Sequence, residues 1–335
     1  MASIRPTQAD ELLRHVVVVG GAGFIGGHAV DRLLADPETV QVTVFDNFSS
    51  GRESHLAPHA SDKRLKIVRG DVKDIDALTR AMEGHTTAIH LASNPDIAKA
   101  MTDPTIDFDE GTLLTHHVVE SMRRAGLTQI LYASGSGVYG DIGAEEAAED
   151  RGELIPVSTY GASKLAGEAL IASYCYMFDM IGCAFRFGNV VGPRQTHGVG
   201  FDFTRRLIAE PTVLPIIGDG TQSKSYVHVS EVLDAVFLAA RKAPEPFEVF
   251  NVATGDYITV TEIADLAVEV AGLAQGSVEY SYAGGDRGWR GDVPVVRLNT
   301  DRIRSLGWGN HMNTRAALKA SLVSMLEEER AGLLT

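Results

Sequence analysis

The chain has 335 residues, a formal net charge of −14 at pH 7 and two cysteines, Cys175 and Cys183. This length allows one large domain or two closely joined ones, and the acidic charge disfavours nucleic acid and anionic lipid as partners. No segment reaches the roughly 18 continuous apolar residues that span a bilayer, and the cysteines match no metal-ligand or disulfide spacing. Residues 1–14 resemble a polar lead-in rather than a secretion signal, so we expect a cytoplasmic protein that binds no metal and no membrane.

Short apolar runs alternate with stretches of helical periodicity through the first half of the chain. Six runs predict buried strands: 16–19, 42–45, 65–68, 88–91, 130–133 and 181–185. The segments between them predict four helices: 26–35, 75–82, 113–125 and 160–178. This alternation is typical of an α/β fold with a doubly wound parallel sheet, the Rossmann architecture, in which crossover helices cover both faces.

The alternation breaks down after about Gly188, where prolines and a Gly-Asp-Gly turn at 218–220 interrupt the pattern. A helix over 229–242 and a strand over 248–252 are expected to return to the main sheet. A further helix near 260–271 is expected in a smaller C-terminal lobe. We therefore predict a larger domain over 1–188 plus about 226–256, and a lobe over 189–225 plus about 257–335.

A glycine-rich loop, Gly20-Gly21-Ala22-Gly23-Phe24-Ile25-Gly26, joins the first predicted strand to the first predicted helix. Glycines at such a turn allow a tight bend, the close approach of a pyrophosphate and the packing of helix on strand. The phosphates then lie against unpaired amides at the positive end of the helix. The loop predicts a dinucleotide site that includes Gly20, Gly23, Phe24, Ile25 and Gly26, with a simple turn as the alternative.

Acidic and apolar residues at the ends of the next strands extend this site. Asp46 ends the second strand, where a carboxylate accepts hydrogen bonds from both ribose hydroxyls of adenosine and repels a 2′-phosphate. This position favours NAD over NADP, although an aspartate in a turn or a helix cap is the alternative. Asp71 and Val72 follow the third strand and suit the adenine edge. Leu91, Ala92 and Ser93 end the fourth strand and are expected near the nicotinamide half.

Tyr160 and Lys164 lie four residues apart at the start of a predicted helix, within Tyr160-Gly161-Ala162-Ser163-Lys164. This spacing puts both side chains on one face of the helix. A phenol with an ordinary pKa of about 10 is a poor base at neutral pH unless a cation stabilises its phenolate. The Lys164 ammonium and a positive nicotinamide both do so, and Lys164 can also anchor the nicotinamide ribose. The pair predicts proton and hydride chemistry on an alcohol carbon, with a chance pair on a surface helix as the alternative.

With these motifs in this order, the chain resembles the extended short-chain dehydrogenase/reductase family, and within it the nucleotide-sugar epimerases of the UDP-glucose 4-epimerase type. The similarity runs nearly end to end and includes Asp46-Asn47-Phe48-Ser49-Ser50-Gly51-Arg52, Gly70-Asp71-Val72, His90-Leu91-Ala92, Val138-Tyr139-Gly140, Arg186-Phe187-Gly188-Asn189 and Gly291-Asp292-Val293-Pro294. It implies that the larger domain binds NAD, with Asn47, Ser50 and Gly51 among the contacts, and that the lobe binds the nucleotide sugar.

The resemblance also implies a reaction. Tyr160 takes the proton of the sugar C4 hydroxyl while the hydride goes to NAD, and the 4-keto sugar then rotates and is reduced on its other face. Substrate capture in the family depends on an asparagine after the sixth strand, which Asn189 matches, and on basic side chains at the diphosphate. Lys224 stands where an arginine is usual, and Arg287 and Arg290 are further candidates, each with a solvated surface charge as the alternative.

The segment Ser134-Gly135-Ser136-Gly137 departs from the family pattern. Related epimerases carry Ser or Thr at the position of Gly135, and that hydroxyl bonds the reacting hydroxyl. We hypothesise that Ser136 replaces it as a catalytic and substrate-binding hydroxyl, beside Ser134, because the flanking glycines let the backbone re-aim it; a loop-capping serine is the alternative. Dehydratases of the family carry an Asp-Glu pair at the positions of Ser136 and Gly137, so 4,6-dehydration is disfavoured.

These features favour an NAD-dependent 4-epimerase of a UDP-hexose or a UDP-hexuronate. A 4-ketosugar reductase or a UDP-glucuronate decarboxylase on the same scaffold is one alternative. A non-catalytic NAD-binding sensor is another, because Gly135 and Phe108 replace side chains that contact substrate and cofactor in the family. Trp289 similarly stands where an arginine at the diphosphate is common. The resemblance also implies a homodimer, which pairs the helices predicted over 113–125 and 160–178 across a two-fold axis.

Overall fold

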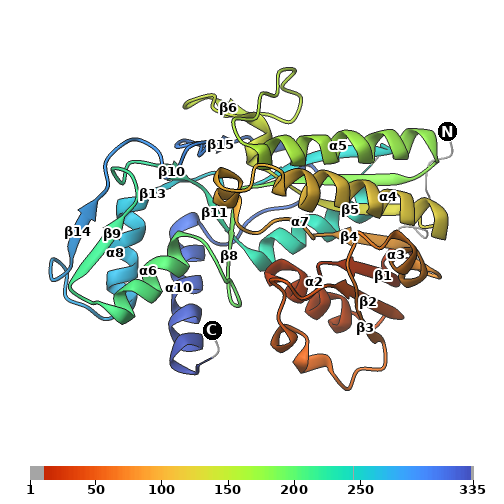
Figure 1. Cartoon of the computed structure of the whole chain (residues 1–335), viewed down its shortest axis with the longest axis horizontal. Helices are drawn as coiled ribbons and strands as arrows, with labels where there is room; N and C mark the ends of the chain where they lie inside the picture. Colours follow the sequence, from red (N-terminus) through yellow and green to blue (C-terminus); the bar gives the residue numbers. More distant parts are fainter. Residues whose placement is uncertain (1–10, 244, 333–335) are drawn as a thin grey trace.

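Seven parallel strands form the central sheet of the protein in a computed structural model that describes residues 11–243 and 245–332 (Figure 1). The strands lie in the order β12-β7-β5-β4-β1-β2-β3, and each neighbouring pair is parallel. Their bounds are His15–Val19 (β1), Gln41–Asp46 (β2), Leu65–Arg69 (β3), Thr87–His90 (β4), Gln129–Gly135 (β5), Ile181–Phe187 (β7) and Phe247–Val252 (β12). The predicted α/β fold class and its six strands are confirmed, and the strand expected over 248–252 joins the same sheet.

Both faces of the sheet are covered because successive strand residues point to opposite sides. Val16 and Val18 of β1 belong to the apolar cluster under α2 and α7, whereas Val17 and Val19 belong to the cluster under α3, α4 and α5. The helices span Phe24–Ala35 (α2), Ile75–Met82 (α3), Leu113–Ala125 (α4), Thr159–Met177 (α5), Val229–Lys242 (α7) and Asp301–Ser305 (α9). The first five of these agree with the predicted helices to within two residues at each end.

Short helical turns connect these elements. A π-helix, η5, spans Phe108–Thr112 and leads directly into α4. The remaining turns are 3-10 helices over Glu11–Leu13 (η1), Glu53–His55 (η2), Ala57–His59 (η3), Ile97–Met101 (η4) and Ser136–Tyr139 (η6). Of the lead-in expected over 1–14, residues 1–10 lie outside the described part of the chain.

A second group of elements forms a lobe beside the sheet, on the left in Figure 1. Three helices, Val199–Ala209 (α6), Val260–Val270 (α8) and Thr314–Arg330 (α10), share an apolar cluster there. Four strand pairs accompany them: Asn189–Val191 (β8) with Tyr226–His228 (β11), Val213–Ile216 (β9) with Glu279–Tyr282 (β14), Ser223–Lys224 (β10) with Ile258–Thr259 (β13), and Glu146–Ala147 (β6) with Arg297–Leu298 (β15). The sequence predicted α8 but neither α6 nor α10.

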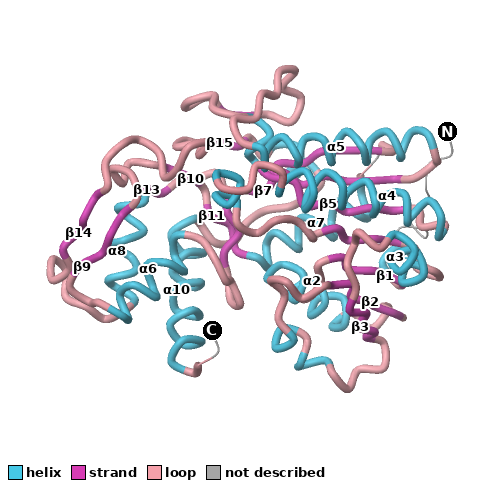
Figure 2. The backbone as a smooth tube through the Cα atoms, in the orientation of Figure 1, coloured by secondary structure: helices cyan, strands magenta, loops and turns pink. Residues whose placement is uncertain are grey.

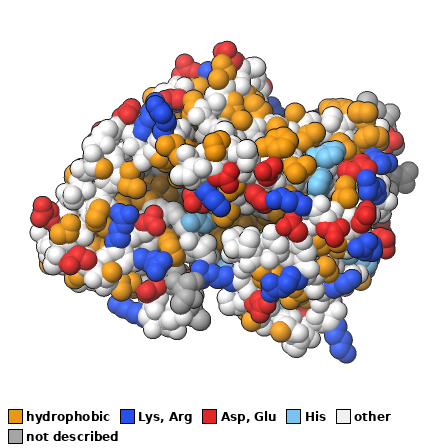
Figure 3. Space-filling model, viewed as in Figure 1, with side chains coloured by type: hydrophobic (Ala, Val, Ile, Leu, Met, Phe, Trp, Pro, Cys, Tyr) orange, Lys and Arg blue, Asp and Glu red, His pale blue; other side chains and the backbone are white. Residues whose placement is uncertain are grey.

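The lobe begins at the carboxyl edge of the sheet, because β8 follows β7 after a single residue. In Figure 2 the strands of the main sheet stand apart from the short strand pairs of the lobe, and the surface in Figure 3 is indented between the two parts. Open α/β sheets bind ligands in the crevice at this edge. No helix within 11–243 or 245–332 has the length and hydropathy needed to cross a membrane.

Candidate active site

The glycine loop forms a cradle that side chains would fill. Gly20 has a φ of +82°, and a Cβ there would come within 2.7 Å of the Ala92 amide nitrogen. A Cβ on Gly26 would come within 2.3 Å of the Gly20 carbonyl oxygen. Gly23 caps α2 without any side-chain hydrogen bond, so the first amides of the helix stay open to an anion. This geometry fits the pyrophosphate of a dinucleotide.

Asp46 lies at the carboxyl end of β2 beside this loop and is nearly buried. Its two carboxylate oxygens accept hydrogen bonds from the Ala22 and Phe48 amides, at 2.9 and 2.8 Å. Each oxygen has a second acceptor site, so the carboxylate is held rigidly and can still receive ribose hydroxyls. Gly51 packs against it, because a Cβ there would come within 3.0 Å of Asp46 Oδ1 and 2.8 Å of the Ala22 Cβ.

The other residues predicted for the cofactor lie along the same edge. Asp71 Oδ1 accepts the Lys73 amide at 2.9 Å in the turn after β3, and Asn47 Oδ1 accepts the Ser49 amide at 3.0 Å after β2. The amides of Leu91 and Ala92 donate to the Val19 carbonyl oxygen, which ties the end of β4 to β1. The remaining predicted contacts on this edge are Phe24, Ile25, Ser50, Val72 and Ser93. As a set these residues fit NAD.

Tyr160 and Lys164 lie in the first turns of α5, which begins at Thr159 because the Ser158 side chain caps it by accepting the Gly161 amide at 3.1 Å. Lys164 is buried, and its Nζ donates to the Ala133 carbonyl oxygen at 2.8 Å. The same Nζ lies 5.4 Å from the centroid of the Tyr160 ring. Burial lowers the pKa of Lys164 to about 8, against the opposing effect of the Asp107 and Glu168 carboxylates.

Burial raises the pKa of Tyr160 to about 12. The nearby Ser93 side chain acts on this pKa in the opposite direction, and the charge of Asp107 adds to the rise. A phenolate at neutral pH therefore needs nearby positive charge, which Lys164 supplies in part. The structure thus brings together the two residues of the predicted reactive pair, Tyr160 and Lys164.

Asp107 is a site residue that the sequence did not predict. It precedes the π-helix η5 and has 1% exposure. Its Oδ1 accepts the Asn94 side-chain amide at 3.0 Å, and its Oδ2 accepts the Thr159 hydroxyl at 2.7 Å. Asn94 follows Ser93 and Thr159 precedes Tyr160, so one carboxylate joins the loop after β4 to the start of α5. No motif or spacing marks Asp107, because the three segments meet only in the fold.

The serine segment has two different environments. Ser134 is buried and donates to Glu168 Oε1 at 2.5 Å, and Glu168 forms a buried ion pair with Arg186 at 2.7 Å. Ser136 is half-buried and is the first residue of the turn η6. The substrate contact of Ser134 stays a prediction. The Ser134 hydroxyl already donates to an internal partner, Glu168. Glu168 lies four residues after Lys164 on the same helix face, a spacing that could have found it from the sequence.

The predicted diphosphate cations are held by carboxylates. Lys224 Nζ lies 2.6 Å from Asp292 Oδ1, and an Arg287 nitrogen lies 2.6 Å from Asp141 Oδ2. Arg287 also donates to the Asp292 carbonyl oxygen at 2.9 Å, which joins the two pairs. Arg290 is exposed on the same loop, and Asn189 Nδ2 donates to the Ser225 carbonyl oxygen at 3.3 Å beside β10. Lys224 and Arg287 are therefore both paired with carboxylates, and their contact with a diphosphate stays a prediction.

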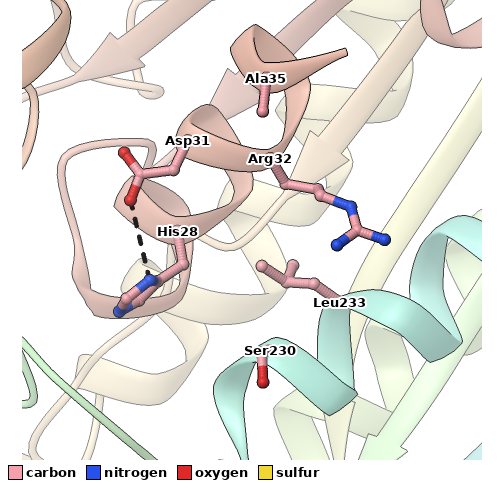
Figure 4. Close-up of a pocket in the computed structure, with 6 residues that line it drawn as sticks. All are labelled: His28, Asp31, Arg32, Ala35, Ser230 and Leu233. Atoms are coloured by element: carbon pink, nitrogen blue, oxygen red, sulfur yellow. Dashed lines mark ion pairs between the residues drawn. The ribbon is translucent and has the colours of Figure 1, made fainter.

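A separate pocket of about 270 Å³ lies between α2 and α7 (Figure 4). In Figure 4 His28 points toward Asp31, with Nδ1 at 3.8 Å from Oδ2. The pocket is lined by His28, Asp31, Arg32, Ala35, Ser230 and Leu233. None of these residues belongs to the predicted site, so this pocket is distinct from that site.

Comparison with known proteins agrees with this geometry. The model of the NAD dependent epimerase/dehydratase family matches residues 16–253. UDP-glucose 4-epimerase of Mycolicibacterium smegmatis is 34% identical over 299 residues, which cover 87% of this chain and 92% of the relative. A crystal structure of UDP-galactose 4-epimerase is similar with a TM-score of 0.82 at 34% identity, covering 93% of this chain and 99% of that one.

A dehydratase is similar as well. The dTDP-glucose 4,6-dehydratase DesIV from Streptomyces venezuelae, solved with NAD bound, has a TM-score of 0.86 at 25% identity and covers 95% of this chain and 98% of its own. The matching proteins therefore include two reaction types on one NAD-binding scaffold. The chain belongs to the NAD-dependent epimerase/dehydratase family, of the extended short-chain dehydrogenase/reductase type.

Proposed function

We propose that the protein is an NAD-dependent 4-epimerase of a UDP-hexose or a UDP-hexuronate that acts through a 4-keto intermediate. The observation that carries the proposal is the pair of Tyr160 and buried Lys164 at the same edge of the sheet as the open glycine cradle. The epimerase relatives at 34% identity support the reaction type.

Each of these side chains then has a distinct role. Tyr160, as phenolate, takes the proton of the sugar C4 hydroxyl and later returns it. Lys164 keeps positive charge beside the phenolate and is anchored for this by the Ala133 carbonyl oxygen. Asp46 binds the adenosine ribose, and the amides at the start of α2 bind the pyrophosphate. When bound, NAD accepts the C4 hydride and gives it back, so the cycle needs no added reductant.

Dehydration is the main competing reaction in the family. It requires an acid and a base to expel the C6 hydroxyl, and positions 136 and 137 hold serine and glycine in place of the carboxyl groups of dehydratases. This observation favours epimerisation. A 4-ketosugar reductase, a UDP-glucuronate decarboxylase and a non-catalytic NAD-binding sensor stay alternatives, and each differs from an epimerase in its product or its use of NADH.

Substrate binding, assembly and location belong to the same proposal. The lobe over 189–225 plus about 257–335 binds the nucleotide sugar through Asn189, Lys224, Arg287 and Arg290. The domain over 1–188 plus about 226–256 binds NAD.

A homodimer through α4 and α5 is supported by exposed apolar side chains at the end of α5, such as Met177 at 70% exposure. The cytoplasmic location stays a prediction.

The test is incubation of the purified protein with UDP-, GDP-, CDP- and dTDP-sugars, with product identification by chromatography and NMR. The proposal predicts a C4 epimer from a UDP-hexose or UDP-hexuronate without added NADH. Dependence on NADH, loss of CO2 or a 4-keto-6-deoxy product would each establish an alternative enzyme. Bound NAD without any product would establish the sensor.

A further inference from the structure

A buried histidine supports the glycine cradle from the side of the turn η2. His55 has 5% exposure, and its Nδ1 donates to the Ala22 carbonyl oxygen at 2.9 Å and to the Gly23 carbonyl oxygen at 3.3 Å. Both acceptors are carbonyls, so Nδ1 is the ring nitrogen that carries the proton. Burial lowers the pKa of His55, against the opposing effect of these two hydrogen bonds, so the ring is neutral at pH 7.

The two carbonyls belong to the peptide units of the cradle itself. A peptide unit is planar, so the direction of each carbonyl fixes the direction of the amide that follows it in the chain. The Ala22 carbonyl fixes the Gly23 amide, and the Gly23 carbonyl fixes the Phe24 amide, which is the first amide of α2. A donor on these carbonyls therefore holds the amides against which a pyrophosphate lies.

Arg194 packs against His55 from the segment that leads from β8 into the lobe. Its Nη1 donates to the His55 carbonyl oxygen at 3.4 Å, and its Nη2 donates to Asp31 Oδ2 of α2 at 2.7 Å. Gly27 leaves the space for this packing, because a Cβ there would come within 3.2 Å of Arg194 Nη1 and 3.1 Å of the His55 Cβ. The backbone of Arg194 has a φ of +63°, a left-handed conformation that a residue with a side chain rarely adopts. Its tertiary contacts hold it there.

The same segment joins the cradle helix to a helix of the lobe. The Arg194 amide donates to Glu328 Oε1 of α10 at 2.9 Å, and the Pro193 carbonyl oxygen accepts His28 Nε2 of α2 at 2.9 Å. In Figure 1 the turn after β8 lies between α10 and α2. The lobe is therefore connected to the peptide units of the cradle through two side chains, Arg194 and His55.

We propose that His55 is a positioning residue of the NAD cradle, and that Arg194 links it to the lobe so that NAD and the nucleotide sugar bind cooperatively. The cooperativity rests on the proposed function, under which the lobe binds the sugar, whereas the role of His55 rests on NAD binding alone. A pyrophosphate on the amides fixes the cradle, and the fixed carbonyls hold His55 and, through it, Arg194. By linkage, each ligand then tightens the binding of the other by the same factor.

The first test is calorimetric titration of NAD into protein freed of NAD. His55→Leu removes the donor, so it should raise the Kd of NAD by about 10-fold. His55→Asn keeps a donor on the same γ carbon and should stay within about 3-fold of the wild type. Thermal unfolding without NAD gives the folded fraction of each variant.

His85→Leu is the matched control for this titration. His85 is also buried, and its Nδ1 lies 3.2 Å from two carbonyl oxygens, those of Met82 and Glu83. It lies between α3 and β4, at the amino end of the strand and away from the cradle. The variant should lose stability, with the Kd of NAD unchanged.

The second test measures the Kd of UDP with and without saturating NAD. In the wild type, NAD should tighten UDP binding by about 5-fold or more. Arg194→Met, which removes the guanidinium, should bring this ratio close to one, and Asp31→Ala, which removes its partner on α2, should do the same. Arg32→Ala is the control, because Arg32 of α2 pairs with Asp234 of α7 and not with the lobe.

The role of His55 is overturned if His55→Leu binds NAD as tightly as the wild type, or if His55→Asn or His85→Leu weakens binding as much as His55→Leu does. The link through Arg194 is overturned if the wild-type ratio is one, or if Arg194→Met and Asp31→Ala leave it unchanged. If UDP does not bind to the wild type, the proposed function fails together with the cooperativity. The NAD titration still decides the role of His55 in that case.

Discussion

Asp107 raises the pKa of the two groups on which the proposed chemistry depends, Tyr160 and Lys164. Replacing it by asparagine removes a negative charge, so the pKa of each group falls. We predict that Asp107→Asn shifts the whole pH profile of kcat to lower pH, which initial rates across a pH series would measure. Asp103→Asn, at a half-buried position nearby, is the control and should leave the profile in place. A shift of the Asp107→Asn profile to higher pH would contradict the assignment.

Side chains that act through one short segment could be predicted, and those that act across segments could not. Tyr160 and Lys164 follow from a four-residue spacing on one helix, and Asp46 follows from its place at a strand end. The hydrogen bond between Thr159 and Asp107 joins residues 52 positions apart, and it depends on the segment between β4 and α4. The spacing from Lys164 marks Glu168 itself, but its contact with Ser134, 34 positions away, could not be predicted for the same reason.

At the scale of elements, the start of α5 is the most sensitive point, because Tyr160 is its second residue. Removing the cap in Ser158→Ala should cost about 1 kcal/mol of unfolding free energy and also lower kcat, because the first turn frays. Asn313→Ala removes an equivalent cap from α10, where Asn313 accepts the Ala316 amide at 2.8 Å. Urea unfolding should show a similar loss in both variants, with kcat reduced only in Ser158→Ala. Equal effects on kcat would contradict the proposed role of this turn.

The glycine cradle gives a second prediction at this scale. A methyl group at Gly26 would lie 2.3 Å from the Gly20 carbonyl oxygen, so the loop must move. Overpacking of this kind costs about 1–3 kcal/mol, so Gly26→Ala should weaken NAD binding by about 10- to 100-fold, measured by calorimetry. Gly152→Ala is the control, because a Cβ there would meet no atom within 4 Å. Unchanged affinity in Gly26→Ala would contradict the pyrophosphate site.

Elements with their own periodicity were predicted, and elements that depend on distant partners were not. The strands of the main sheet are near-continuous apolar runs because both faces are buried. The small strand pairs are two to four residues long, and β6 pairs with β15 about 150 residues later, so neither length nor pattern marks them. The helix α10 was missed because it follows a region of glycine and proline and carries charges through its last turns.

At the scale of the whole molecule, ion pairs link the lobe to the segments around the sheet. Arg287 lies in the loop between β14 and β15, and its partner Asp141 lies between β5 and β6. If Arg287 binds the diphosphate, Asp141 competes with the substrate for it. We predict that Asp141→Asn lowers KM for the UDP-sugar by about 2- to 5-fold, the range of a surface ion pair, in steady-state kinetics.

The control for this prediction is Glu145→Gln, which removes the exposed partner of Arg151 in the same segment. It should leave KM unchanged. A higher KM in Asp141→Asn would mean that Asp141 holds Arg287 in its binding position rather than competing for it.

In the proposed cycle, one bound NAD takes a hydride from sugar C4 and returns it to the same carbon. The most direct measurement is NMR of the product after incubation of the protein with UDP-glucose or UDP-glucuronate deuterated at C4, without added cofactor. We expect the C4 epimer of one of these sugars with deuterium still on C4. Loss of the label, or a product that is reduced, decarboxylated or dehydrated, would contradict it.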